Sequence, residues 1–216
     1  MKSVFSPMVL RTTAMLALST LLGACAPILV GTAVVGGTLV VTDRRTSGAQ
    51  LEDEGIELRG ASRVQSVLGD RGHVNVNSYN RQVLLTGEVA NAQDKAAAEQ
   101  AVAKVENVRA IVNELAVMGV SSLTQRSSDV LLTARVKASL VDAQDVSANL
   151  FRVVTERGTT YLMGRVTQAE AARATEIARS VSGVLKVVRI FEILSDEEIR
   201  QLSSTANKPA AASKTP

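Results

Sequence analysis

The sequence predicts an α+β protein built from two tandem copies of one αββαβ unit, which follow an N-terminal export signal. The first observation is an internal repeat, because residues 81–117 and 158–194 match at small and apolar positions. The second is a pair of β-branched segments around a two-residue turn in each copy. The third is an alanine-rich segment at helical spacing that follows each pair. We expect each unit to form a small three-stranded sheet with both helices on one face.

The N-terminus has the layout of a secretory signal peptide. Lys2 and Arg11 precede an apolar run over residues 14–22. This run is too short to span a bilayer, which takes about 20 apolar residues. It ends in Leu22-Gly23-Ala24-Cys25, a tetrapeptide that resembles the lipobox of bacterial lipoproteins. The resemblance implies that residues 1–24 are a lipoprotein signal peptide.

Cys25 is the only cysteine in the chain, so it cannot form an internal disulfide. The lipobox resemblance implies that its thiol forms a thioether to diacylglycerol and that its new amino group is acylated, with palmitate or a similar chain. The alternative is a buried, inert cysteine, but the flanking residues have no helix or strand period that would place it in a core. Because Ala26 follows the cysteine, the resemblance implies an anchor in the inner leaflet of the outer membrane, facing the periplasm.

Residues 25–47 form an apolar, glycine-rich linker that is too short and too rich in glycine to favour a second membrane helix. We expect it to lie near the membrane surface or against the folded body. Loss of Lys2 and Arg11 with the signal peptide leaves 22 basic against 21 acidic side chains, a net charge of +1. With 2 Tyr, 3 Phe and no Trp, the chain also has few rings on which bases could stack. We therefore expect no nucleic-acid partner.

The first unit, residues 48–117, is expected to contain a helix over 53–68, strands over 73–79 and 82–89, a helix over 92–106 and a strand over 108–117. Asn80-Arg81 supplies the hairpin turn. In the second helix Ala97, Ala101 and Val105 share one face, which lets the helix lie close to a sheet.

The second unit, residues 121–194, repeats this order with a helix over 128–141, strands over 149–156 and 159–166, a helix over 168–181 and a strand over 184–194. Here the turn is Arg157-Gly158, and Ala174, Ala178 and Val181 form the small-residue face. Ser195 and Glu198 have capping-box spacing, so we expect a short helix over 195–202. The polar segment 203–216 is expected to be disordered.

The repeated pattern Gly-x-Val, about twenty residues, then Gly or Asn followed by Val-x-x-Val resembles the BON domain. The matching residues are Gly87, Val89, Asn107, Val108 and Val112, then Gly164, Val166, Gly183, Val184 and Val188. With the lipobox, the chain is similar to the dual-BON-domain outer-membrane lipoproteins. That resemblance implies periplasmic display, binding of anionic phospholipid mainly through the second domain, and a role in outer-membrane integrity. Asn107 departs from the usual Gly, and we expect only a local turn change there.

The helix over 128–141 carries the candidate lipid-binding residues. Leu132, Val136 and Leu140 recur at i, i+4 and i+8 and form the core-facing stripe. Away from this stripe lie Val130, Leu131, Ala134, Arg135 and Lys137. Apolar side chains beside Lys and Arg suit an interface with anionic headgroups. The alternative is that Val130 and Leu131 pack under the first domain.

We expect no catalysis and no metal. His73 is the only histidine, so no Cys/His pair or zinc ligand set is apparent, and a strand-edge histidine is expected to be a plain surface residue. Gly87 and Gly164 lack a phosphate-loop context and are expected to be structural. No residue pattern indicates a cofactor. A protein-interaction scaffold that docks envelope proteins is the alternative to a phospholipid-binding module.

Overall fold

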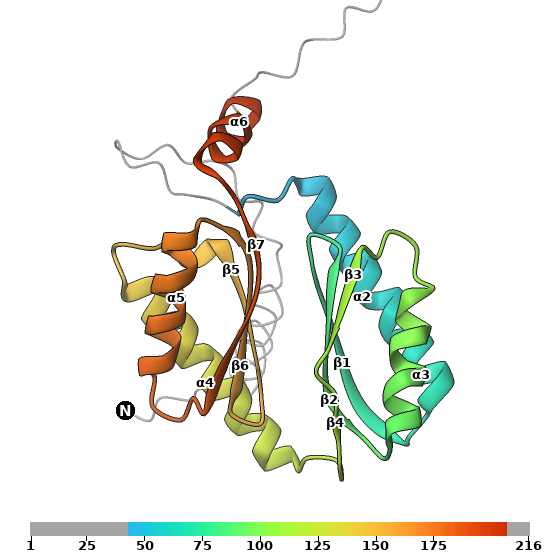
Figure 1. The fold of residues 1–216 in the computed structure, drawn as a ribbon. Helices are drawn as coiled ribbons and strands as arrows, with labels where there is room; N and C mark the ends of the chain where they lie inside the picture. Colours follow the sequence, from blue (N-terminus) through green and yellow to red (C-terminus); the bar gives the residue numbers. More distant parts are fainter. Residues whose placement is uncertain (1–42, 207–216) are drawn as a thin grey trace, which may run out of the picture. The chain divides into compact units, whose positions relative to one another are not determined.

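The computed structural model describes residues 43–206, and the first repeat unit within them has the expected αββαβ order (Figure 1). Its elements are α2 (Ser47–Leu68), β1 (Gly72–Tyr79), β2 (Gln82–Val89), α3 (Ala92–Ala103), β3 (Ala110–Asn113) and β4 (Ala116–Val117). Helix α2 begins earlier than the sequence predicts because the Thr46 side chain accepts a hydrogen bond from the N–H of Ala49 and caps the helix there.

The second unit repeats this order in α4 (Leu123–Asp142), β5 (Phe151–Glu156), β6 (Thr159–Val166), α5 (Gln168–Ser180) and β7 (Lys186–Ile193). A short 3₁₀ turn, Ala148–Leu150, precedes β5 where the sequence predicts strand. Ser122 caps α4 as Thr46 caps α2, so α4 also starts before the expected residue 128. Helix α5 begins with a full capping box between Thr167 and Glu170.

The two sheets share one topology. In each, the central strand pairs antiparallel with the strand before it and parallel with the strand after the crossover helix, in the orders β1-β2-β3 and β5-β6-β7. The β1–β2 turn has positive φ at both Asn80 and Arg81, and the β5–β6 turn at Arg157 and Gly158. Two consecutive positive φ values define the type I′ turn, which matches the twist of the strands. The predicted hairpins and their turns are confirmed.

The closing strand of the first sheet is interrupted, whereas the sequence predicts one strand over 108–117. Strand β3 ends at Asn113, and the short β4 pairs separately with β2. The Asn113 side chain accepts a hydrogen bond from the N–H of Leu115 and donates one to the carbonyl of Lys95. This local hydrogen bonding replaces the regular ladder of the sheet.

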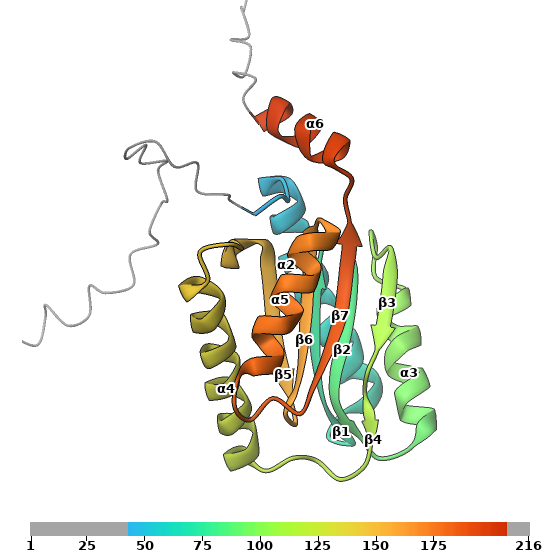
Figure 2. The same ribbon diagram turned by 60° about the vertical axis from the view of Figure 1, so that its left-hand side comes forward.

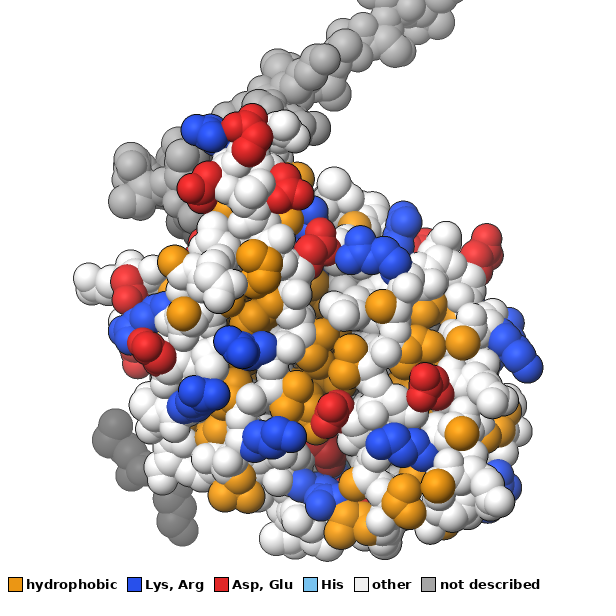
Figure 3. Space-filling model, viewed as in Figure 1, with side chains coloured by type: hydrophobic (Ala, Val, Ile, Leu, Met, Phe, Trp, Pro, Cys, Tyr) orange, Lys and Arg blue, Asp and Glu red, His pale blue; other side chains and the backbone are white. Residues whose placement is uncertain are grey.

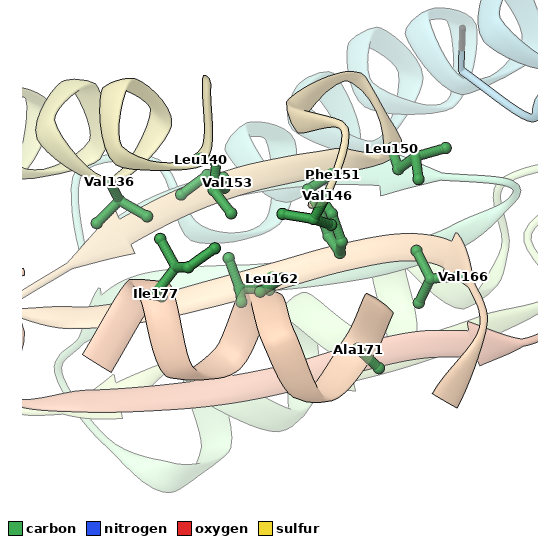
Figure 4. Close-up of a cluster of buried hydrophobic side chains, with 12 residues drawn as sticks. Val136, Leu140, Val146, Leu150, Phe151, Val153, Leu162, Val166, Ala171 and Ile177 are labelled. Atoms are coloured by element: carbon green, nitrogen blue, oxygen red, sulfur yellow. The ribbon is translucent and has the colours of Figure 1, made fainter. Parts of the chain in front are cut away.

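Each pair of helices covers one face of its own sheet, α2 and α3 in the first unit and α4 and α5 in the second (Figures 1 and 2). Figure 4 shows the buried core of the second unit, in which Val136 of α4, Leu162 of β6 and Ile177 of α5 belong to one cluster, with Leu162 beside Ile177. Ala174 and Ala178 are fully buried, as expected for a helix that lies close to a sheet. In the first unit Ala101 and Val105 of the predicted stripe are buried, and Ala97 is only partly buried, because α3 also turns Ala98 and Val102 to the core.

The opposite faces of the sheets meet in a third apolar cluster, which contains Tyr79 and Leu84 of the first unit and Tyr161, Met163 and Ile190 of the second. Hydrogen bonds surround it: Asn80 Nδ2 donates to Glu192 Oε2 at 2.6 Å, and Arg152 pairs with Glu57 at 2.8 Å. Consecutive apolar residues such as Val83-Leu84-Leu85 are typical of a strand buried on both faces. This pattern is a sequence signal that both faces of the sheet are covered.

The helix after β7 is longer than the sequence predicts. Ser195 and Glu198 form the predicted capping box, with the N–H of Ser195 donating to Glu198 Oε2 at 2.8 Å. Helix α6 (Asp196–Ala206) then continues beyond residue 202. Residues 203–206 are therefore helical, and the expectation of disorder was wrong for them, because the capped first turn propagates through residues that can all adopt helix. Residues 207–216 lie outside the described part of the chain.

Candidate functional site

Helix α4 has two different faces. Leu132, Val136 and Leu140 are buried in the core, as the sequence predicts. Val130 and Leu131 are 68% and 64% exposed. The alternative, that these two side chains pack under the first domain, is wrong, because most of each residue is exposed, although Val130 lines a cavity with His73 of the first domain.

The exposed apolar surface runs along the length of α4. At 100° per residue, Leu123, Val130, Ala134 and Val141 fall within an arc of about 40°, and all four are exposed. The arc lies on the side of the helix away from the core stripe. We call these four residues with Leu131 the α4 ridge. Exposed apolar residues that form a continuous stripe, unlike scattered ones, mark an interaction surface.

Basic side chains border the α4 ridge on both sides. Lys137 lies beside Val130 and Ala134, and Arg135 lies beyond Leu131; both are exposed. Within the described residues neither forms an ion pair with a carboxylate, and Arg135 instead donates to the carbonyl of Ser182 at 3.3 Å. Both charges are therefore available to an external anion.

The loop before β7 extends this surface and was missed from the sequence. Leu185 is 81% exposed and Lys186 is exposed beside it. The loop lies against α4, because an added Cβ at Gly183 would be 3.5 Å from Leu132 Cδ1. The sequence signal for this extension is a large apolar residue followed by lysine, shortly after the turn at Gly183. Figure 3, which shows the face on which β7 lies, has Lys and Arg side chains over the second unit among hydrophobic ones.

A second group of polar side chains lies where one end of the first sheet meets the second unit. His73 and Glu88 are directly paired across β1 and β2, and Glu156 ends β5. The Nδ1 atom of His73 is 3.7 Å from Glu88 Oε2, and Asn75 Nδ2 donates to Glu156 Oε2 at 2.9 Å. The expectation that His73 is a plain surface residue is wrong, because the second unit covers the face of β1 on which it lies and buries its Nδ1.

This group, which we call the interface cluster, contains buried polar atoms without hydrogen-bond partners. Among the described residues they are His73 Nδ1, Thr86 Oγ1 and Glu88 Oε1. Glu88 is 0% exposed, and its other oxygen accepts hydrogen bonds from the N–H and hydroxyl of Ser121. Leaving a buried polar group unpaired costs about 1–3 kcal/mol. Three such atoms at one place therefore require a physical explanation.

Burial and charge set the protonation of the interface cluster. Burial, together with the nearby Arg126 charge, lowers the pKa of His73 below its ordinary value of 6.5, so its imidazole is neutral at pH 7. Burial also raises the pKa of Glu156, with Glu88 and Asp129 acting in the same direction. Burial therefore drives both shifts, and the neighbouring carboxylates add to the shift of Glu156 but oppose that of His73.

Comparison with known proteins identifies the repeat. Residues 60–119 and 128–194 each match the model of the BON domain. Outer membrane lipoprotein DolP of Haemophilus influenzae is 39% identical over 168 residues, which cover 75% of this chain and 87% of that protein. The chain belongs to the family of outer-membrane lipoproteins with two BON domains. This membership confirms the predicted family and the predicted localisation at the outer membrane.

Two further comparisons extend this one. The 21 kDa hemolysin of Actinobacillus pleuropneumoniae is 33% identical to the BON-domain lipoprotein, over 69% of this chain and 78% of that protein. The C-terminal domain of CdsD, a structural protein of the type III secretion system of Chlamydia trachomatis, aligns with 62% of this chain and 96% of that chain at 12% identity. Its TM-score of 0.28 is too low to support an argument.

The motif glycines of the BON-domain lipoprotein have structural roles, as predicted. Gly87 has φ +113°, and a Cβ there would lie 2.0 Å from the carbonyl oxygen of His73. A Cβ at Gly164 would lie 2.7 Å from the Leu150 carbonyl oxygen. Asn107, at the position of Gly183, keeps a positive φ of 66° and donates to Glu52 at 3.1 Å. The turn is preserved because asparagine tolerates the left-handed region better than other non-glycine residues.

The N-terminal features of the BON-domain lipoprotein lie outside the described residues. These are the signal peptide 1–24, Cys25 and the linker up to residue 42. The lipid on Cys25 and the leaflet in which it is anchored stay predictions. Within residues 43–206, no helix combines the length and the apolar character that crossing a membrane requires.

Proposed function

We propose that this lipoprotein binds anionic phospholipid at the membrane surface through its second BON domain and thereby supports outer-membrane integrity. The observation that carries the proposal is the exposed α4 ridge with Arg135 and Lys137 beside it, neither of which pairs with a carboxylate of residues 43–206. Leu185 and Lys186 continue the same combination of an apolar side chain with a basic one. Such surfaces insert apolar groups at the acyl boundary while cations contact headgroups.

The forces involved are modest but additive. Each Lys or Arg near an anionic surface contributes about 1 kcal/mol, and burial of apolar surface contributes about 25 cal/mol per Å². An anchor on Cys25 would hold the domain at the bilayer, so weak contacts at high effective concentration suffice. Charge distribution agrees with this site, because residues 121–194 have 10 basic and 7 acidic side chains, whereas residues 53–117 have 7 and 9.

Co-sedimentation with vesicles tests the proposal. We would use a chain over residues 40–216, because Asp43, Arg44 and Arg45 form hydrogen bonds with the folded body. Binding is compared between vesicles that contain phosphatidylglycerol and purely zwitterionic vesicles, at low and high salt. We expect salt-sensitive binding to the anionic vesicles alone.

Matched variants locate the surface. Arg135→Glu with Lys137→Glu is expected to abolish retention on anionic vesicles without changing the circular dichroism spectrum. Arg63→Glu with Lys104→Glu makes the same change of charge at exposed positions of the first domain and is expected to bind normally. Leu131→Ser is expected to weaken binding, whereas Leu58→Ser, at an equally exposed leucine of α2, is not. An equal loss of vesicle binding in the two double variants would contradict a specific site on α4.

We propose a binding role and not a catalytic one, because the α4 ridge is apolar and the side chains that border it, Arg135 and Lys137, are basic. The scaffold alternative makes a different prediction. If envelope proteins are the ligand, binding to vesicles is absent while a lipid-free partner is retained by the wild type and lost in the α4 variants. That outcome would move the function of this surface from lipid to protein recognition.

A further inference from the structure

We propose that His73, Glu88 and Glu156 form a binding site for a divalent transition-metal ion, with Zn²⁺ as the best fit, that links the two BON domains. One ligand atom from each residue can be chosen so that all three lie within 4.8 Å of one another. His73 and Glu88 belong to the first domain and Glu156 to the second. The inference is independent of the proposed lipid-binding surface.

The backbone brings these side chains to one point. Direct pairing in the antiparallel β1–β2 register places His73 and Glu88 on the same face of the sheet. That face also carries Leu84, which belongs with Met163 of the second sheet to the apolar cluster between the sheets. Glu156 enters from the end of β5, and its hydrogen bond to Asn75 holds it against β1. The ligands are therefore positioned by strands and not by loops.

The unpaired buried atoms of His73 and Glu88 are available to bind a cation. Glu88 is fully buried, yet Oε1 has no hydrogen-bond partner, and the buried Nδ1 of His73 also has none. At 3.7 Å, His73 Nδ1 and Glu88 Oε2 are too far apart to form a hydrogen bond, so the two side chains do not satisfy each other. A ring nitrogen of histidine binds metals through its lone pair. A cation bonded to Nδ1 and Oε1 would satisfy both atoms at once.

The donor set selects the class of metal. One imidazole nitrogen and two carboxylate oxygens, with water in a fourth position, are typical ligands of Zn²⁺. Hard cations such as Mg²⁺ and Ca²⁺ prefer oxygen ligands alone. Zinc bonds of about 2.0–2.1 Å place tetrahedral ligand atoms about 3.4 Å apart. The distance from His73 Nδ1 to Glu88 Oε2 is 3.7 Å, close to this value, and binding through the unpaired Oε1 of the same carboxylate and through Glu156 requires side-chain rotation.

An ion can reach the site from solvent. A cavity of about 340 Å³ is lined by His73 and Glu156, and on the α4 side by Val130 and Thr133. Asp129 also lines this cavity, but both of its oxygens accept backbone hydrogen bonds from Arg157 and Gly158, so it is not offered as a ligand. The cavity leaves room for a metal-bound water.

Calorimetry with the full lipidated chain in detergent tests the site. The chain carries no histidine tag, is stripped with chelator, and is titrated with ZnCl₂, and separately with MgCl₂ and CaCl₂. We expect one Zn²⁺ per chain and no measurable heat with the other two salts. His73 is the only histidine, so its imidazole ¹⁵N NMR signals report on this site alone and are expected to shift at one equivalent of Zn²⁺.

Variants decide whether these residues are the ligands. His73→Gln and Glu88→Gln are each expected to weaken Zn²⁺ binding at least about tenfold, and to remove the rise in melting temperature that Zn²⁺ causes in the wild type. Glu106→Gln, at an exposed carboxylate, is expected to change neither. Glu156→Gln should behave as Glu88→Gln does, which serves as a second test if one variant does not fold. Absence of one-to-one binding at 100-fold excess Zn²⁺, or full retention of it in folded His73→Gln and Glu88→Gln, would overturn the proposal.

Discussion

Asp53 of α2 and Asp129 of α4 hold the two β-hairpin turns in the same way. Asp53 accepts hydrogen bonds from the N–H groups of Asn80 and Arg81, both at 2.7 Å. Asp129 accepts them from Arg157 and Gly158 at 2.8 and 2.9 Å. In both domains a buried carboxylate on the first helix thus accepts hydrogen bonds from two N–H groups of a type I′ turn, whose backbone has positive φ. These two hydrogen bonds join the first helix to the hairpin in each unit.

Removal of this carboxylate charge is expected to destabilise the protein strongly. Asp129→Asn keeps the shape but replaces an acceptor oxygen with an NH₂ group that faces a backbone N–H. We expect a loss of about 3 kcal/mol in the free energy of unfolding, because buried donors lose a charged acceptor. Asp142→Asn, at an exposed position of the same helix, is expected to change stability by less than about 0.5 kcal/mol. Urea unfolding followed by circular dichroism measures both, and similar losses would contradict the role of Asp129.

Asp53 is expected to make stability depend on acid pH. Burial alone would raise its pKa, but hydrogen bonds from Ser78, the Arg81 N–H and Arg45 outweigh burial and hold the pKa below the ordinary 3.8. A depressed folded-state pKa contributes stability that is present above pH 3.8 and is lost as the pH falls through the folded value.

Urea unfolding between pH 7 and pH 2.5 checks this dependence. The wild type is expected to lose stability steeply below about pH 4, and Asp53→Asn, already less stable at pH 7, is expected to lose less over the same range. Parallel curves for the two proteins would show that Asp53 does not carry the acid sensitivity.

Gly87→Ala is expected to be among the most damaging single changes. Its φ of +113° disfavours any side chain, and the new Cβ would meet the His73 carbonyl oxygen at 2.0 Å. We expect a loss of at least about 3 kcal/mol, since β1 would have to move away from β2. Gly119→Ala serves as the control, because its Cβ would have no neighbour within 4 Å. A thermal melt that shifts equally for both variants would contradict this.

The segment Asp43-Arg44-Arg45 is expected to stabilise the folded body although it precedes α2. Arg44 donates to both carboxylate oxygens of Glu170 at 2.7 and 2.8 Å, and Arg45 pairs with the buried Asp53 at 2.8 Å. Arg44→Gln is expected to cost about 1–3 kcal/mol, because the bidentate pair is largely buried. Arg59→Gln breaks only the more exposed pair with Glu52 and is expected to cost less than about 1 kcal/mol. Equal costs in chemical denaturation would show that the Arg44 contact contributes nothing specific.

Much of the local structure could be predicted from the sequence. The hairpin segments, both turns and the capping box at Ser195 depend on residues close together in the chain, so their signals are local. The core stripe of α4 was predicted for the same reason. Helix starts were less accurate, since the first buried residues after the caps Thr46 and Ser122 are the polar Asp53 and Asp129, which give no apolar signal for the start of either helix.

The residues of the candidate sites also divide into those with a local sequence signal and those brought together only by the fold. Val130, Leu131, Ala134, Arg135 and Lys137 were predicted from helical periodicity, and the structure leaves them exposed on α4. Leu185 and Lys186 were missed because they join this surface only through the fold of the loop before β7. The interface cluster was missed because His73, Glu88 and Glu156 belong to three strands and two domains.

Spacing within short segments specifies the repeated αββαβ order, the turns and the buried face of α4, so these features follow from the sequence. The packing of the two sheets against each other, and the meeting of buried carboxylates with His73 between them, depend on the complete fold. Strand periodicity specifies which residues share a face but not what covers that face. Contacts such as Asn75 with Glu156, 81 residues apart, form only when separate units pack together.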